Sequence, residues 1–218
     1  MARRRSLARE WIEALPAGAF FFASEVPGEP AAVKPLLSRL ASDPGHAVQR
    51  QMRGFYCKRW GDERKAPFVD RSRGALKLAG PGGGAAGLFA VNRAGWSYQH
   101  PCRYDFAVVG RPPVSPWPTV RFRRRSNVRR DALCASEVTL LEAVRYFDRS
   151  APIPWDEAVA AVRDGTVAQS LARSGPLRPE AVLWVAQSEN GMPARFHERL
   201  GEVCGALAVS GGGRADVL

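Results

Sequence analysis

Cysteine and histidine are scarce in this 218-residue chain, and neither is spaced like a metal site. The four cysteines form no C-x-x-C pair, which argues against a zinc finger and a disulfide scaffold and fits a reducing cytosol. The histidines lie in separate segments, so we expect neither a metal nor a cofactor. The residues are Cys57, Cys102, Cys134 and Cys204, and His46, His100 and His197.

Long apolar runs are also missing. No stretch approaches the ~18 consecutive apolar residues of a membrane helix, and the longest, such as Ala19–Ala23, have the length of a strand. The basic start at Arg3–Arg5 is followed by charged residues and not by the hydrophobic core of a secretory signal. We therefore expect no membrane span and a cytoplasmic protein.

Catalytic motifs are absent as well. The sequence has no G-x-S-x-G, no H-E-x-x-H and no paired aspartates of the nucleotidyltransferase type, so we expect no enzymatic activity. A glycine-rich run, Gly80–Gly87, lacks the Gly-Lys-Ser/Thr ending of a phosphate-binding loop. We interpret it as a structural turn before a close-packed helix, Ala85–Ala94, whose small residues let another helix approach closely.

Positive charge is what the chain has in excess. Lysine and arginine total 32 against 21 acidic residues, and only four of the 32 are lysine. The net charge of +11 is uneven, because residues 1–130 carry +15 and residues 131–218 carry −4. The basic charge of residues 1–130 indicates a polyanionic binding partner, most often nucleic acid, because phosphates neutralised by a protein release their counterions. The alternative is a solubilising surface in an arginine-rich proteome.

The first sixty residues have the pattern of a winged helix-turn-helix. An apolar stripe at Leu7, Trp11 and Leu15 predicts a helix that ends at Pro16. It is followed by a strand, a brief second helix, a third helix and a hairpin. In order these are Ala19–Phe22, a helix capped by Ser24, a helix opened by Glu29-Pro30 and stopped at Asp43, and the strands Ala47–Gln51 and Phe55–Lys58.

In this arrangement the third helix enters the major groove and the hairpin lies along the DNA backbone. Lys34 and Ser38 are the candidates for reading base edges, and the phosphate candidates are Arg39, Arg50, Arg53 and Lys58. A winged helix used only for protein contact is the alternative. Pro35 allows two interpretations, because a proline inside a helix removes one backbone hydrogen bond. Either the helix starts near Lys34, or it is kinked there.

The remaining chain predicts a small sheet followed by helices. Tyr104–Val109 and Val120–Arg123 are the expected strands. Helices are expected over Ser136–Phe147, Trp155–Val162, Val167–Ala172, Pro179–Ser188 and Ala194–Leu207, with a frayed tail from Ser210. The fold class is therefore α+β and mostly helical. The domains are a winged helix over residues 1–62 and a mixed domain over 63–218, with its sheet at about 98–125 and its helices at about 136–208.

A second basic patch lies where the sheet is expected to end. If it is used, it contacts nucleic acid or an acidic protein surface, since arginine forks hold phosphate in a bidentate way. If it is not used, it is a solvated strand edge whose charges block aggregation. In either case we expect the stretch to be exposed and its replacement to leave the fold intact. Its residues are Arg121, Arg123, Arg124, Arg125, Arg129 and Arg130.

Three segments together resemble the AbiEi family of antitoxins. They are LPAGAFFFASEV…AAVKPLLSRLAS…VQRQMRGFY (Leu15 to Tyr56), AGPGGGAAGLFAVNRAGWSYQHPCRYDFAVVGRPP (Ala79 to Pro113) and ASEVTLLEAVRYF (Ala135 to Phe147). The similarity covers roughly Leu7 to Phe147. The chain departs from the family pattern at Pro35 and in the stretch GWSYQHP.

The resemblance implies a bacterial antitoxin of an abortive-infection, phage-defence system. Such a protein neutralises an AbiEii-type nucleotidyltransferase toxin, with or without direct contact. Its winged helix binds inverted repeats in the promoter and autorepresses the operon. The alternative is a stand-alone winged-helix transcriptional regulator with a dimerising or sensing C-terminal domain.

Overall fold

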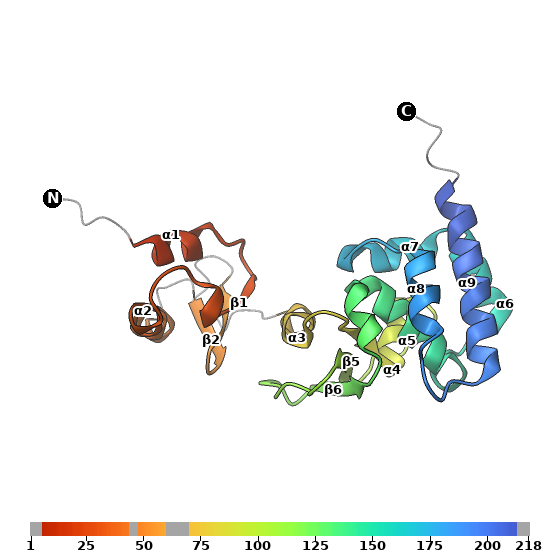
Figure 1. Cartoon of the computed structure of the whole chain (residues 1–218), viewed down its shortest axis with the longest axis horizontal. Coiled ribbons are helices and arrows are strands. Elements are labelled where there is room, and N and C mark those ends of the chain that lie inside the picture. Colours follow the sequence, from red (N-terminus) through yellow and green to blue (C-terminus); the bar gives the residue numbers. More distant parts are fainter. Residues whose placement is uncertain (1–5, 44–47, 60–69, 213–218) are drawn as a thin grey trace. The chain divides into compact units, whose positions relative to one another are not determined.

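The computed structural model describes residues 6–43, 48–59 and 70–212 (Figure 1). The chain divides into two compact units, Met1–Lys77 and Leu78–Leu218. The domain boundary predicted between residues 62 and 63 lies outside the described residues. The predicted fold class is confirmed, because both units combine helices with a small three-stranded sheet and helices predominate. None of the described helices is long and apolar enough to cross a membrane.

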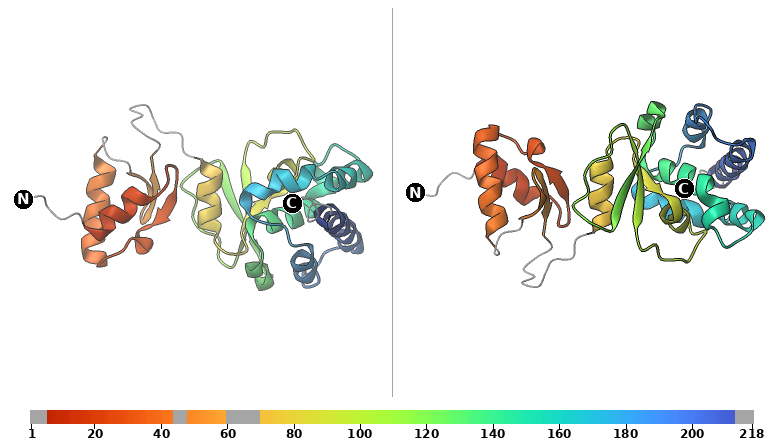
Figure 2. Two further views of the ribbon diagram at one scale, coloured as in Figure 1. Left: turned by 90° about the horizontal axis from the view of Figure 1, so that it is seen from above. Right: turned by 90° about the horizontal axis from the view of Figure 1, so that it is seen from below.

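The first unit is the predicted winged helix. Its strands form one antiparallel sheet in the order β1-β3-β2, and its red and orange helices lie beside this sheet in both views of Figure 2. The second, brief helix of the motif is a single 3-10 turn, η1. The elements are α1 (Leu7–Ala14), β1 (Phe20–Phe22), η1 (Ala23–Glu25), α2 (Pro30–Ser42), β2 (Val48–Met52) and β3 (Phe55–Lys58).

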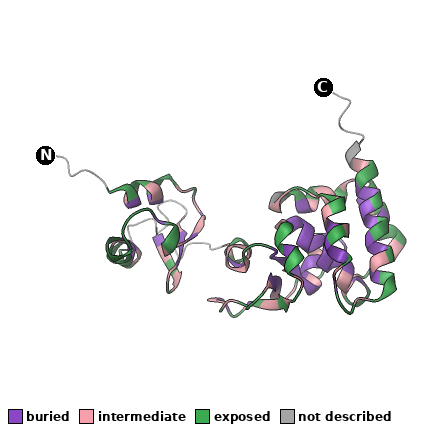
Figure 3. Ribbon diagram, viewed as in Figure 1, coloured by how far each residue is buried: buried purple, intermediate pink, exposed green. Residues whose placement is uncertain are grey.

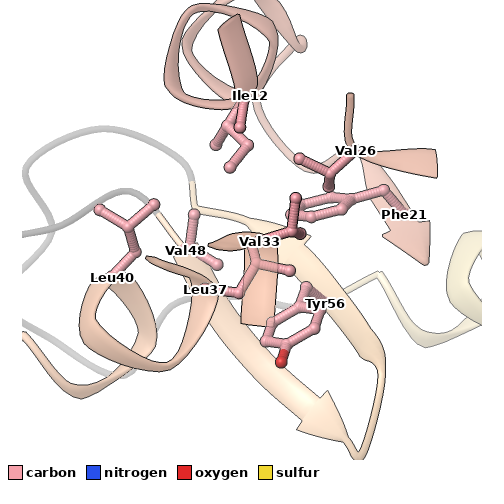
Figure 4. Packing of buried hydrophobic residues seen from close by; sticks show 9 residues of the cluster. Ile12, Phe21, Val26, Val33, Leu37, Leu40, Val48 and Tyr56 are labelled. Carbon is pink, nitrogen blue, oxygen red and sulfur yellow. The ribbon is translucent and has the colours of Figure 1, made fainter. Parts of the chain in front are cut away.

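A compact apolar core fixes α2 against the rest of this unit. Ile12 of α1, Phe21 of β1 and Leu37 of α2 converge on it with at most 3% of their surface exposed (Figure 4). Each buried side chain of this size stabilises the fold by about 1.5–3 kcal/mol. Because the apolar positions of α2 recur at helical spacing, the core holds one face of the helix and leaves the opposite face to solvent.

Pro35 lies inside α2 and not at its start. The helix is continuous from Pro30 to Ser42, so the predicted alternative of a start near Lys34 is wrong. Proline has no N–H, and the carbonyl of Ala31 therefore lacks its usual donor four residues further on. Both residues are exposed, so water can satisfy this carbonyl without the cost of a buried polar group.

The second unit contains a mixed sheet in the order β4-β5-β6. β4 (Gly84–Ala86) pairs antiparallel with β5 (Tyr104–Val109), and β5 pairs parallel with β6 (Val120–Arg125). The two predicted strands are confirmed. The sheet nevertheless begins earlier than the predicted residue 98, because β4 takes up the first two residues of the helix expected at Ala85–Ala94. That helix is α4 (Gly87–Arg93).

Helix α5 (Ala135–Ser150) is the centre of this unit. Its neighbours are β4, α4 and the later helices, and it is buried along most of its length, as the purple segments of Figure 3 indicate. The predicted helices are confirmed to within a few residues, although α9 continues past the predicted end into Gly212. The remaining elements are α3 (Arg71–Ala79), which spans the division between the units, η2 (Val128–Ala132), α6 (Trp155–Arg163), α7 (Thr166–Leu171), η3 (Ala172–Ser174), α8 (Pro179–Ala186) and α9 (Ala194–Gly212).

The glycine-rich run was predicted to be a turn, and it ends in strand β4, which packs closely on α5. A Cβ atom at Gly84 would lie 2.7 Å from the Cβ of Val138 on α5. Gly82 has a φ of +66°, and a Cβ there would lie 2.8 Å from the backbone carbon of Arg130. Only glycine allows such a close approach, so the run brings β4 onto α5.

Candidate nucleic-acid interface

The face of α2 opposite the core carries the predicted base-reading residues. Lys34, Ser38 and Arg39 are exposed, whereas Val33 and Leu37, which directly precede Lys34 and Ser38, are buried in the core. This separation follows from the 3.6-residue period of the helix. The exposed face combines a cation, a hydroxyl group and a guanidinium, which are groups that contact base edges and phosphates in a major groove.

The hairpin of β2 and β3 carries two more exposed cations. Arg50 lies in β2 and Arg53 in the turn, where Gly54 has a φ of +78°. Lys58, the third cation predicted to contact phosphate, lies differently. Its Nζ atom donates to the carbonyl oxygens of Glu13 and Leu15, at 2.5 Å each.

Lys58 therefore binds the C-terminal end of α1. That helix end presents carbonyl groups without intrahelical partners, and a cation there stabilises it. The ammonium group is occupied within the fold, which leaves Arg39, Arg50 and Arg53 as the phosphate candidates whose side chains are exposed.

The arginine stretch begins with a carboxylate shared by two arginines. Asp105 of β5 accepts from Nε of Arg121 at 2.7 Å and from Nη2 of Arg123 at 2.7 Å. Burial raises the pKa of Asp105, but the hydrogen bonds and charges of the two arginines outweigh it and hold the pKa below its ordinary value. Arg121 and Arg123 are thus partnered on the sheet itself.

Further along, the stretch enters a buried ionic network. Arg125 holds both carboxylate oxygens of Glu142, at 2.8 and 2.5 Å. Arg130 holds both oxygens of Glu189, at 2.7 and 2.9 Å. Nη1 of Arg130 also forms an ion pair with Glu142, at 2.8 Å. Arg145 of α5 bridges the two carboxylates, at 3.3 and 3.2 Å.

The network controls the ionisation of its carboxylates. Burial raises the pKa of Glu142, but the hydrogen bond from Arg125 and the charges of Arg130, Arg125 and Arg145 outweigh it and lower the pKa to about 2. The pKa of Glu189 is lowered in the same way, against its own burial, chiefly by Arg130. Both carboxylates are therefore charged at neutral pH.

These contacts overturn the expectation that the whole stretch is exposed and replaceable. Arg130 has no exposed surface, because two buried carboxylates hold it inside the unit. Replacing it cannot leave the fold unaffected. Two arginines of the stretch do keep largely exposed side chains without an acidic partner among the described contacts: Arg124, and Arg129, whose guanidinium lies 5.0 Å from the ring of Trp184.

Sequence reasoning missed the acidic half of this network. Glu142 stands between Leu141 and Ala143 in the apolar middle of a helix, and a lone acid there is a signal of a buried ion pair. Glu189 lies between Ser188 and Asn190, polar neighbours that give no such signal, whereas Arg145 stands between Val144 and Tyr146. Within the described ranges, no group of three or more His, Cys, Asp or Glu side chains is arranged to hold a metal ion.

The fold places this chain among proteins in which a winged-helix unit is followed by a second α+β unit that contains a parallel pair of strands. No protein-family model and no curated protein matches the sequence. Among solved structures, the crystal structure of the RV2827C protein from Mycobacterium tuberculosis is similar. It is 13% identical, the match covers 95% of this chain and 78% of that chain, and the TM-score is 0.42.

Proposed function

We propose that this chain is a DNA-binding antitoxin that represses its own operon and neutralises a nucleotidyltransferase toxin. The observation that carries the DNA-binding half is the basic surface of the first unit, where exposed residues of α2 and of the hairpin are those that a winged helix turns toward DNA. The antitoxin half rests on the sequence resemblance to the AbiEi family. In this proposal the protein acts in the bacterial cytoplasm and has no catalytic activity.

The two sets of exposed residues have different tasks in this proposal. Lys34 and Ser38 lie on α2 and read base edges of an inverted repeat in the promoter. Arg39, Arg50 and Arg53 bind phosphates and set the position of the unit on the duplex, without reading sequence. Phosphate binding releases counterions, so affinity must fall steeply with salt.

The DNA-binding half is tested by titrating the full chain against a labelled promoter fragment of its operon and a scrambled duplex. We expect Arg50→Ala and Arg53→Ala to weaken binding to both duplexes and to make the log–log salt slope shallower by about one unit each. Lys34→Ala should also reduce the preference for the promoter. The matched control is Arg163→Ala, an exposed arginine of α6. Equal effects of Arg163→Ala and Arg53→Ala would contradict the proposal.

The antitoxin half is tested separately, by expressing the full chain together with the product of the neighbouring reading frame, which this proposal predicts to be a nucleotidyltransferase. We assign toxin neutralisation to the second unit, so the double variant Arg50→Ala/Arg53→Ala should still protect cells while it no longer represses the operon. Loss of protection in this variant would reverse the assignment. Promoter binding without any protection would favour the stand-alone regulator.

A further inference from the structure

The buried ionic network of the second unit has an unbalanced charge. Among the described residues it joins three arginines, Arg125, Arg130 and Arg145, to two carboxylates, Glu142 and Glu189. Arg130 and Glu142 have no exposed side-chain surface, and Glu189 has 3%. The network therefore carries one surplus positive charge in an environment from which water is largely excluded. A charge in such a place is costly unless an opposite charge lies close by.

The geometry locates the surplus charge at Arg145. Arg125 with Glu142 and Arg130 with Glu189 are two closed bidentate pairs, each with both nitrogens at or below 2.9 Å. Arg145 joins them through longer contacts and turns its Nε and Nη2 atoms to the sulfur of Met192, a weak and neutral acceptor. Its side chain is 18% exposed, so it forms the edge of the network that an outside ligand can reach.

A polar cavity of about 250 Å³ borders this edge. Arg125, Arg145 and Glu189 line it from the network, and the exposed Arg124 lines it from the end of β6, so three arginines face one glutamate. Both oxygens of that glutamate are already held by Arg130. Ser126 and Asn190 add a hydroxyl group and a side-chain amide to its wall. The cavity is smaller than the ~300–1,000 Å³ typical of sites for drug-sized ligands, which favours a small ion. Convergent guanidinium groups with neutral donors are suited to a tetrahedral oxyanion.

We propose that this cavity binds one phosphate-class oxyanion, inorganic phosphate or a phosphate monoester, which neutralises the surplus charge of the network. The anion is held by Arg124 and Arg145 and by the neutral donors of the wall, while the carboxylates of the two closed pairs position Arg145. The proposal does not depend on DNA binding by the first unit, and its test contains no DNA.

The test is thermal unfolding of the full chain over a series of inorganic phosphate concentrations, with sodium chloride added to keep the ionic strength constant. A ligand that binds only the folded state raises the Tm, and at about five times its Kd the expected rise for a protein of this size is about 2–4 °C. Isothermal titration should give one phosphate per chain. Phosphate and chloride that stabilise equally would overturn the proposal.

Two variants distinguish phosphate binding at this cavity from a general effect of anions on the charged surface. Arg124→Ala should weaken phosphate binding at least tenfold, whereas Arg111→Ala, an exposed arginine that does not line the cavity, should leave it unchanged. Arg145→Met leaves the two closed pairs and no surplus charge, so its Tm should no longer respond to phosphate. An undiminished response in Arg145→Met, or equal affinities of Arg124→Ala and Arg111→Ala, would overturn the proposal. If Arg145→Met does not fold, the comparison of Arg124→Ala with Arg111→Ala is sufficient to test the proposal.

Discussion

Replacement of single arginines in the stretch 121–130 should give very different losses of stability. Arg130→Met removes the bidentate partner of Glu189 and leaves that carboxylate with Arg145 at 3.2 Å and Asn127 at 2.9 Å. Breaking a buried pair from one side costs about 3–5 kcal/mol, a large share of the 5–15 kcal/mol of a typical domain. Arg121→Met breaks a pair whose arginine side chain is 45% exposed, so we expect only about 0–1 kcal/mol.

Urea unfolding of the full chain, followed by near-ultraviolet circular dichroism, measures these losses. Arg124→Met is the matched control, because it makes the same substitution at an exposed neighbour and should change the free energy of unfolding by less than about 0.5 kcal/mol. With a slope near 2 kcal/mol per molar urea, Arg130→Met should lower the midpoint of the second unit by about 2 M. Equal midpoints for Arg130→Met and Arg124→Met would refute the reasoning that burial determines the loss.

Three further outcomes follow from the same contacts. Because the folded-state pKa of Glu142 is lowered to about 2 from an ordinary 4.5, its stabilising effect is present above pH ~4.5 and is lost as the pH falls toward 2. Urea midpoints at pH 7, 4.5 and 3 should decrease only below 4.5, and a midpoint that is flat down to pH 3 would exclude this role. Leu37→Ala should destabilise the first unit by about 2–5 kcal/mol in a thermal melt, while Ser38→Ala on the exposed face should stay within about 0.5 kcal/mol. Gly84→Ala should destabilise the second unit by about 1–3 kcal/mol, because the added Cβ atom would clash with α5. Gly201→Ala, in the middle of α9 where nothing lies within 4 Å of the added Cβ atom, should stabilise the unit by about 0.5–1 kcal/mol. If both variants changed the free energy of unfolding in the same direction, the packing argument would be disproved.

Local sequence signals were sufficient for most elements of this protein, but not for α3 and β4. The apolar stripe of α2, the glycine in the hairpin turn and the breaks between the later helices each depend on residues within a few positions of one another, so they can be read without knowing the fold. The exposure of Lys34 and Ser38 follows in the same way, because a helix that buries Val33 and Leu37 must turn these residues outward.

Tertiary structure alone decided what the charged residues do. Arg130 has the same local surroundings as the exposed Arg129, and it is buried because Glu142 and Glu189 come to it from distant parts of the chain. Lys58 lies in the hairpin strand β3, as predicted, but the fold brings the carbonyl groups at the end of α1 to its ammonium group. The periodicity of apolar residues predicts which face of a helix or strand is buried. Which acidic residue pairs with a given arginine depends instead on contacts between elements far apart in the sequence, and these contacts form only when the chain folds.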